Sequence, residues 1–402
     1  MNESTVDGAA SPFVRRVLQG HSVETRVALA DEMLLFTLSA HDWDFAIGSY
    51  FDRGRQAFVA QSQIERHFLA GHELVETLEF ASGFGRATRF LLQLHGPDAL
   101  WTTDIQKEAV EFQKNILGCQ TVSPALAPAD FNPGRNFDCV LAHSFFSHIP
   151  QHRFGEWMEA LNDCVAPDGI LVFSVHDESL LESGAGESGI TFASLSESNR
   201  LNAAEYGTTW VSPDYVGNVI QKHCSGRSMV RWPRGLANFQ DLYIVFGEHS
   251  SVGLPAFDQG PFGFASIARM AGADLDLIGW ASHWNPARSV ARIVVEIGGH
   301  VLGETEFFFP RQDVVDHLAD PRHLNSGWHL RMELPRMCSA QTDVVAIRAI
   351  SDLGTESFLY LGTVADLLLA SCRSELAASG RLRTLFLDQD QNDPLEELYR
   401  SR

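Results

Sequence analysis

Between residues 74 and 248, short apolar runs alternate with longer amphipathic stretches, and this alternation constrains the possible fold more than any other feature. A parallel sheet whose strands are joined by crossover helices produces such a pattern. The clearest apolar runs are LVETLEF (74–80), ALWTTD (99–104), FDCVLAH (137–143) and GILVFSVH (169–176). Helical spacing is present between them in ATRFLLQLH (87–95), KEAVEFQKNIL (107–117) and FGEWMEALNDCV (154–165). Two later runs, RSMVRWP (227–233) and DLYIVFGE (241–248), are predicted to close the sheet as an antiparallel pair.

After residue 250 the helical spacing gives way to period-two alternation. Two hairpins are predicted, because ARIVVEI and HVLGETEF flank Gly298 and Gly299, and DVVAIRAI and SFLYLGTV flank Asp352 and Gly354. With LIGWAS (277–282) and WHLRMEL (328–334) they favour an antiparallel β-sandwich at 264–370. Glycine and proline cluster just before it, which places a linker at 251–263.

The ends of the chain have a different texture. Residues 1–20 are small, polar and aperiodic, so we expect a mobile tail there. Residues 21–70 are predicted to be helical, with Val27, Leu29 and Met33 on a buried stripe. Residues 371–402 are predicted to be an exposed acidic helical tail. The remaining segment, 71–250, is the predicted α/β domain.

Charge and cysteine usage narrow the class of protein. The 402 residues carry a formal net charge of −21, which opposes binding to nucleic acid. No apolar run is long enough to span a membrane and no signal peptide precedes the first helix, so we expect a cytoplasmic protein. The cysteines are too scattered to suggest disulfides or a zinc site: Cys119, Cys139, Cys164, Cys224, Cys338 and Cys372.

A glycine turn carries the first sign of chemistry. EFASGFGR (79–86) follows a predicted strand and opens a helix, where glycines let backbone approach a ligand. Nineteen residues after Gly85 the next strand ends in Asp104, whose carboxylate can accept two ribose hydroxyls. Asp130 and Phe131 follow a proline-rich loop and can place an acceptor and an aromatic face beside an adenine. Each feature also has a structural explanation, since the glycines suit any tight turn, Asp104 can cap a helix and Phe131 can be a core residue.

Taken in order and spacing, EFASGFGR, WTTDIQKEAVEFQKN, PADFN, FDCVLAHSFFSHIP and APDGILVFSVHD resemble the motifs of class I S-adenosylmethionine-dependent methyltransferases. The chain looks closest to bacterial members of unassigned substrate that share a segment like Ser49-Tyr50-Phe51 and a late Gln240-Asp241-Leu242. The resemblance implies a Rossmann-like sheet of seven strands with N-terminal helices, and S-adenosylmethionine as cofactor.

The resemblance also implies roles for single residues. Asp104 would take the ribose, with Ile105 beside it, while Asp130 and Phe131 would frame the adenine. The residues implied to shape the methionine pocket are Glu79, Ala81, Gly83, Gly85 and His143. Ala81 departs from the family pattern, which has glycine there; alanine is allowed at negative φ, so we expect weakened rather than abolished cofactor binding.

His148 and His176 are the candidates for a catalytic base. Both lie at the carboxyl ends of predicted central strands, where open α/β sheets bind their ligands, although a structural role is as plausible for each. His143, His148 and His152 do not share one helical face, so a metal site is not expected.

The expected activity is methyl transfer to a hydroxyl group of a sugar or another small molecule. The segment 178–200 is rich in glycine and serine and is predicted to be a lid or acceptor loop, followed by Tyr206 and Trp210 as candidate pocket residues. The segments RQDV (311–314) and NSGW (325–328) resemble those of a small β-sandwich attached to bacterial glycosyltransferases and methyltransferases that act on surface polysaccharide, which suggests a role in its biosynthesis and a glycan acceptor. Trp280, Trp284, Trp328 and His329 could stack on a sugar there, although core packing is the commoner role. The alternatives are a non-catalytic S-adenosylmethionine-binding protein and a carbohydrate-binding protein.

Overall fold

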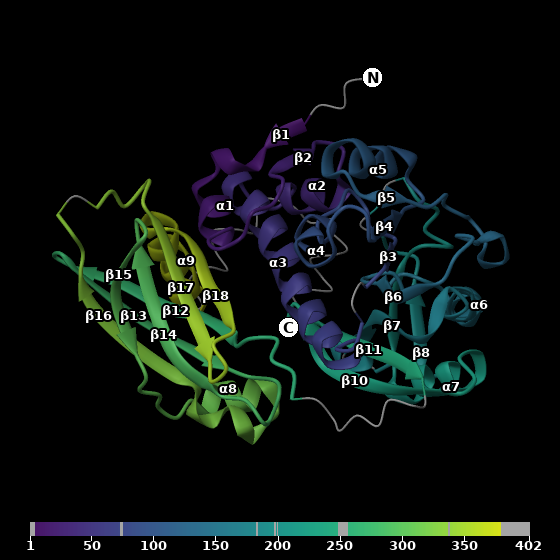
Figure 1. Cartoon of the computed structure of the whole chain (residues 1–402). Coiled ribbons are helices and arrows are strands. Elements are labelled where there is room, and N and C mark those ends of the chain that lie inside the picture. The colour runs from purple at the N-terminus through teal and green to yellow at the C-terminus, as the bar shows by residue number, and fades with distance from the viewer. Residues whose placement is uncertain are drawn as a thin grey trace. The chain divides into compact units, whose positions relative to one another are not determined.

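The computed structural model describes residues 5–72, 75–181, 184–196, 198, 200–247, 256–336 and 338–378. The chain divides into two compact units (Figure 1). Unit 1 comprises 1–261 together with Trp284–Arg288, and unit 2 comprises Phe262–His283 and 289–402. The division after Pro261 falls within the range predicted as a linker, of which residues 251–255 lie outside the described residues.

Unit 1 is built on a sheet in which parallel strands form the centre, as the alternating pattern predicts. Its main path runs β10-β11-β7-β6-β3-β4-β5. The parallel strands are β3 (Thr77–Phe80), β4 (Leu100–Thr103), β5 (Gln120–Thr121), β6 (Phe137–Ala142) and β7 (Val165–Asp177). The antiparallel pair β10 (Arg227–Leu236) and β11 (Gln240–Gly247) extends the sheet beyond β7.

The prediction of seven strands is wrong, because nine strands of the described residues belong to this sheet. The additional ones are β8 (Ile190–Ala193) and β9 (Thr208–Val211), which pair with each other, while β9 also pairs with the end of β7. β8 lies within the 178–200 segment, which is predicted from the sequence to be a loop. The strand is short and the segment is rich in glycine and serine, so the sequence pattern does not reveal it.

Helices cover both faces of this sheet (Figure 1). On one face α6 (Gln151–Asn162) and α7 (Pro213–His223) bury Trp157, Val216 and Ile220 against strand residues that include Val140. On the other, α3 (Trp43–Phe68) and α4 (Thr88–His95) pack against residues such as Leu141. Neighbouring residues of β6 thus point to opposite faces, as in any strand buried on both sides.

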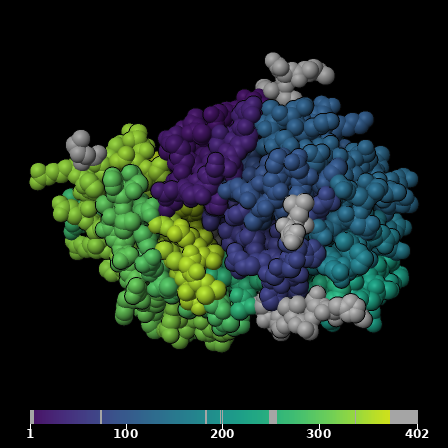
Figure 2. Space-filling model, in the orientation of Figure 1, coloured from purple at the N-terminus to yellow at the C-terminus, as the bar shows by residue number. Residues whose placement is uncertain are grey.

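The N-terminal residues differ from both predictions made for them. Where a mobile tail is predicted, the structure has β1 (Thr5–Asp7) and α1 (Pro12–Val17), and Ser11 caps α1 through its side chain. The helical assignment of Val27 is also wrong, because it lies in β2 (Arg26–Ala28), which pairs with β1. Helix α2 (Glu32–Leu38) follows, and Figure 2 shows these first residues, in purple, packed against the blue part of the same unit.

Helix α3 contains a glycine that lets it approach the turn after β3. A Cβ at Gly54 would lie 2.2 Å from the carbonyl oxygen of Arg86. Only glycine permits this contact, so α3 is placed directly against the loop that is expected to bind the cofactor.

Unit 2 consists of two antiparallel sheets that share one hydrophobic core. The first has the order β12-β13-β16, and the second β15-β14-β17-β18. Its elements are β12 (Phe262–Ala271), β13 (Asp274–Ser282), β14 (Val290–Ile297), β15 (His300–Thr305), α8 (Gln312–Leu318), β16 (Gly327–Glu333), β17 (Val344–Ser351), β18 (Glu356–Thr363) and α9 (Val364–Ala378). Both predicted hairpins are found, one at Gly298 and Gly299 and the other at Asp352 to Gly354.

Two of the tryptophans considered for sugar stacking are enclosed in unit 2. Trp328 is fully buried and Trp280 is 7% exposed, so neither presents a face for a ligand. The acidic tail predicted at 371–402 begins inside α9, and residues 379–402 lie outside the described residues. None of the helices in the described ranges combines the length and the apolar character that crossing a membrane requires.

Candidate functional site

The turn between β3 and α4 has three consecutive odd-numbered residues in the left-handed region. The φ angles of Ala81, Gly83 and Gly85 are 54°, 55° and 79°. The expectation that Ala81 has a negative φ is therefore wrong: the residue adopts the conformation that glycine supplies in the family pattern. Holding a non-glycine residue there costs about 1–2 kcal/mol.

Hydrogen bonds from the next strand hold this turn in place. The backbone N–H of Ser82 donates to Thr103 O at 3.1 Å, and the N–H of Gly83 donates to Asp104 Oδ2 at 2.8 Å. A Cβ at Gly85 would lie 2.4 Å from Leu117 Cδ1, so the close packing of this residue requires glycine. The turn is thus positioned by β4 and by the segment that follows α5.

That segment supplies a residue which the sequence reasoning missed. α5 (Lys107–Phe112) continues into a π-helical turn (Gln113–Leu117), a local irregularity often found at functional sites. The buried amide of Gln113 donates to Ser82 Oγ at 2.8 Å and to Gly83 O at 2.7 Å. The only sequence signal is a glutamine at an otherwise apolar helical position.

Asp104 lies at the carboxyl end of β4, as predicted. Its two oxygens accept the N–H groups of Gly83 and Gln106, each at 2.8 Å, and its side chain is 8% exposed. Burial raises the pKa of Asp104 above its usual value, and the two hydrogen bonds oppose this shift. Ile105, the next residue, is 43% exposed and presents an apolar surface beside it.

Glu79 lies at the end of β3 and is completely enclosed. Thr88 Oγ1 donates to its Oε2 at 2.6 Å. Burial, reinforced by the negative charge of Asp104, raises the pKa of Glu79 to about 7, while Thr88 and Arg86 oppose the shift. The group can therefore exchange a proton near neutral pH.

Asp130 and Phe131 are placed differently from each other. Asp130 ends a short 3-10 helix (Pro128–Asp130) and is exposed. The ring of Phe131 is 7% exposed and packs edge to face on Phe80, with 5.1 Å between the centroids. Phe131 thus belongs mainly to the core, which was the alternative considered for it.

His143 follows β6 and carries two shielded ring nitrogens. Neither Nδ1 nor Nε2 has a hydrogen-bond partner among the described residues. Burial, with the positive charge of Arg86, lowers the pKa of His143 to about 3. The ring is therefore neutral at physiological pH and offers one donor and one acceptor to a ligand.

His148 lies in the loop after β6, and its Nδ1 makes a hydrogen bond to the backbone. Its Nδ1 is 2.6 Å from the carbonyl oxygen of Gly207, and its ring stacks on Tyr206 with 4.6 Å between the centroids. A carbonyl oxygen only accepts, so Nδ1 carries the proton and Nε2 is the basic nitrogen of the neutral ring.

His176 lies at the end of β7, and the structure brings it next to His148. Their ring centroids are 6.1 Å apart. Trp210 and Phe239 pack beside His176 at centroid distances of 6.1 Å and 5.4 Å. The predicted bases and the predicted pocket residues Tyr206 and Trp210 thus meet at the carboxyl edge of the sheet.

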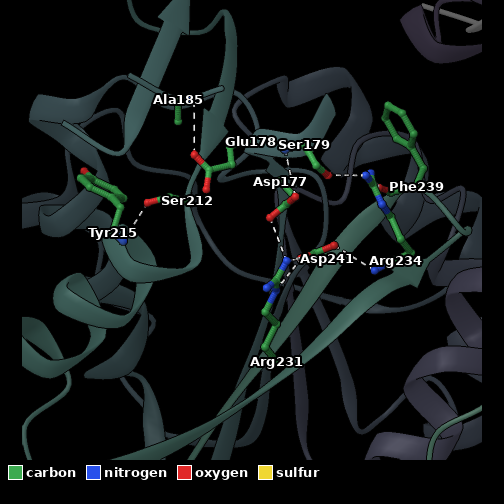
Figure 3. A network of polar contacts seen from close by, with 10 residues as sticks. All are labelled: Asp177, Glu178, Ser179, Ala185, Ser212, Tyr215, Arg231, Arg234, Phe239 and Asp241. Atoms are coloured by element: carbon green, nitrogen blue, oxygen red, sulfur yellow. Dashed lines mark hydrogen bonds and ion pairs between the residues drawn. The ribbon is translucent and has the colours of Figure 1, made fainter. Parts of the chain in front are cut away.

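The carboxylate of Asp177 is engaged in an ion-pair network, shown in Figure 3. Arg231 Nη2 lies 2.8 Å from Asp177 Oδ2 and 2.6 Å from Asp241 Oδ2, so one guanidinium bridges β7 and β11. Asp177 also caps the following 3-10 turn by accepting the N–H of Ser179. Both carboxylate oxygens of Asp177 therefore have partners within the protein.

The three histidines considered for metal binding do not converge. His152 is exposed and faces Glu205, with 3.5 Å between Nε2 and Oε2. In the described part of the chain no three His, Cys, Asp or Glu side chains form a group that could hold a metal ion.

Comparison with known families agrees with this arrangement. Residues 78–171, from β3 into β7, match the family model of a methyltransferase domain. No curated protein matches the chain in sequence.

Several solved structures share low sequence identity with this chain. A complex of DhpI with SAH is 19% identical and covers 54% of this chain and 97% of its own, with a TM-score of 0.37. The glycopeptide N-methyltransferase MtfA is 13% identical over 48% of this chain and 90% of its own, with a TM-score of 0.35. Magnesium protoporphyrin IX methyltransferase from Synechocystis PCC 6803, with bound SAH, is 13% identical over 52% and 90%, with a TM-score of 0.35.

The family match places a methyltransferase domain on the strands and turns that form the candidate site. Residues 78–171 of this chain are thus a methyltransferase domain.

Proposed function

We propose that this chain is an S-adenosylmethionine-dependent methyltransferase that acts on a hydroxyl group of a sugar or another small molecule, with His148 as the general base. The observation that carries the proposal is the 2.6 Å contact between His148 Nδ1 and Gly207 O. It orients the ring and leaves Nε2 as the proton acceptor, which is what a hydroxyl nucleophile needs from a base.

The residues at the glycine turn fit the cofactor. The two buried ring nitrogens of His143 have no hydrogen-bond partner among the described residues. The exposed Ile105 presents an apolar surface next to the carboxylate of Asp104. Asp104 would hold the ribose, Ile105 and Asp130 the adenine, and Glu79, Gly83, Gly85 and His143 the methionine end. When bound, S-adenosylmethionine supplies a methyl group on a positively charged sulfur.

The acceptor would bind where the aromatic side chains gather. Tyr206 fixes one face of His148, and Trp210 and Phe239 lie against His176. The partly exposed rings of Tyr206 and Phe239 suit the faces of sugar rings as well as those of aromatic compounds, whereas Trp210 is 7% exposed and packs against His176. The role in surface polysaccharide biosynthesis extends this proposal to a glycan acceptor and rests on the resemblance of the sandwich.

Positioning should supply most of the rate, because a held nucleophile gains roughly 7–11 kcal/mol from proximity. A positioned base adds about 10²- to 10⁴-fold. His148→Ala should therefore lower turnover by about 10² or more without changing the affinity for cofactor.

The test compares His148→Ala with His176→Ala. Transfer of labelled methyl from S-adenosylmethionine is followed over a panel of small sugars, phenols and glycans, while calorimetry measures cofactor binding for each variant. Full turnover in His148→Ala would remove it as the base. Cofactor binding without transfer to any member of the panel would favour a non-catalytic binding protein.

A further inference from the structure

A chain of buried hydrogen bonds ends on His176. The N–H of Ser144 donates to Ser174 Oγ at 2.7 Å, and Ser174 Oγ donates to Gln240 Oε1 at 2.6 Å. Gln240 Nε2 then lies 3.1 Å from His176 Nε2. Ser174 is fully buried, and Gln240 and His176 are each 8% exposed.

The direction of this chain is determined by its first member. A backbone N–H only donates, so Ser174 Oγ accepts from Ser144 and has one proton left to give, which goes to Gln240 Oε1. The hydroxyl of Ser144 donates to the same Oε1 at 3.2 Å. The amide therefore turns its NH₂ group toward His176.

The reverse amide orientation is unfavourable. It would point the NH₂ group at Ser174 and leave the buried hydroxyl proton of Ser174 without its acceptor, because among the described residues the hydrogen bonds of this side chain are those to Ser144 and Gln240. An NH₂ group cannot accept, so His176 Nε2 must be the unprotonated nitrogen and Nδ1 must carry the proton.

The position of Gln240 is held by its neighbour. Asp241 accepts from Arg231 Nε at 2.7 Å and from the backbone N–H of Arg234 at 2.9 Å, as Figure 3 shows. Arg231 in turn binds Asp177, the residue after His176. One ion-pair network thus fixes both the residue that donates to His176 and the strand end that carries it.

We propose that Gln240 is a positioning residue that holds His176 in the Nδ1–H tautomer, so that His176 serves the acceptor site as a hydrogen-bond donor and not as a base. The proposal rests on the proposed function. It divides the work between the two histidines: the Nδ1 proton of His148 is bound to Gly207 and its Nε2 accepts a proton, whereas Nε2 of His176 is engaged by Gln240.

The tautomer can be measured without any turnover. ¹⁵N NMR of the full chain with labelled histidine distinguishes protonated from unprotonated ring nitrogens, and the signals of His176 are assigned by their loss in His176→Asn. In the wild type, Nε2 should give the unprotonated shift and Nδ1 the protonated one. A protonated Nε2 would overturn the proposal.

Two variants change the hydrogen-bond chain from Ser144 to His176 in different ways. Gln240→Glu replaces the donor by a carboxylate, which accepts, so the proton should move to Nε2. Ser174→Ala removes the hydroxyl that orients the amide, so both tautomers should become populated. An unchanged His176 spectrum in both variants would show that Gln240 does not set the tautomer.

Kinetics separate this inference from the proposed function. With an acceptor that the wild type methylates, Gln240→Glu should lower kcat about 10-fold or more while the affinity for cofactor stays the same. Gln240→Asn keeps the amide on a shorter side chain, so its kcat should lie below that of the wild type. If the protein methylates none of the acceptors but gives the predicted NMR result, the assigned tautomer of His176 is supported and only the proposed function is refuted. An unchanged kcat in Gln240→Glu with a shifted tautomer would overturn the role of His176 as a donor.

Discussion

Asp104 accepts a hydrogen bond from the backbone N–H of Gly83, with 2.8 Å between Oδ2 and N. The residue expected to hold the ribose therefore also shapes the turn expected to hold the methionine. Its other oxygen accepts the N–H of Gln106, the residue before α5. Cofactor affinity and the conformation of the turn should consequently change together when Asp104 is replaced.

We expect Asp104→Ala to weaken cofactor binding by about 1.5–3 kcal/mol, the usual range for a lost hydrogen bond to a charged group. Asp104→Asn keeps an oxygen acceptor and should lose less. Isothermal calorimetry with S-adenosylmethionine gives both values, and a thermal melt shows whether the variants are folded. A folded Asp104→Ala variant with wild-type affinity would remove Asp104 from the site.

Ala81→Gly should stabilise the protein, because glycine reaches a φ of 54° without steric cost. Relief of about 1–2 kcal/mol of strain, less the entropy that glycine loses on folding, leaves a net gain of roughly 1 kcal/mol. We also expect tighter cofactor binding, since the turn would no longer carry this strain. Chemical denaturation and calorimetry measure the two effects.

Gly83→Ala is the matched control for that change. Gly83 has nearly the same φ, 55°, and an added Cβ would meet nothing within 4 Å, so only backbone strain is introduced. It should lose roughly the stability that Ala81→Gly gains. If the two changes move the free energy of unfolding in the same direction, strain at the turn does not explain either.

Glu79→Gln should change how stability depends on pH. The pKa of Glu79 is raised to about 7 in the folded protein from an unfolded value near 4.5, so folding favours its protonated form. The cost of burying the charge is absent below about pH 4.5 and fully present above about pH 7. The wild type should therefore lose about 3 kcal/mol relative to Glu79→Gln as the pH rises across this window.

Urea denaturation of both proteins at several pH values between 4.5 and 8 measures that difference. Thr88 can donate to the amide oxygen of glutamine as it does to Glu79 Oε2, so the variant keeps this hydrogen bond. Parallel stability curves for the two proteins would show that Glu79 has no raised pKa.

The strands and hairpins could be predicted because their signals are local. β6 and the part of β7 from Ile170 to Val175 are predominantly apolar runs, and the turn at Gly298 and Gly299 lies between two alternating segments. β2 could not be predicted in this way, because Val27 pairs with Val6 from a segment without apolar periodicity. Pairing over that distance is a tertiary effect that local spacing does not encode.

The site shows the same limit. Asp104 and Ile105 could be located from their position after a strand, whereas the left-handed φ of Ala81 depends on the hydrogen bonds that the following turn residues donate to Thr103 and Asp104. The burial of Phe131 follows from its contact with Phe80, and the commitment of His148 Nδ1 follows from Gly207. Each depends on a partner far away in the sequence.

Gln113 is the residue of the site for which sequence gives the least warning, and its removal should have two effects. Its amide NH₂ donates to Ser82 Oγ and Gly83 O, and its Oε1 lies 3.0 Å from Thr88 Oγ1. Gln113→Leu leaves these buried groups without their partner, at about 1–3 kcal/mol for an unsatisfied group. We expect a lower free energy of unfolding and weaker cofactor binding, because the glycine turn loses its support.

Gln120→Leu is the control, since its amide makes a long surface hydrogen bond, 3.4 Å to Pro97 O, away from the turn. It should change stability by no more than about 0.5 kcal/mol and leave cofactor binding unaltered. Urea denaturation and calorimetry of both variants separate the two contributions of Gln113. A loss of stability in Gln113→Leu with unchanged affinity would make the π-helical turn a purely structural feature, because a turn that binds cofactor cannot lose its hydrogen bonds to Ser82 and Gly83 without losing affinity.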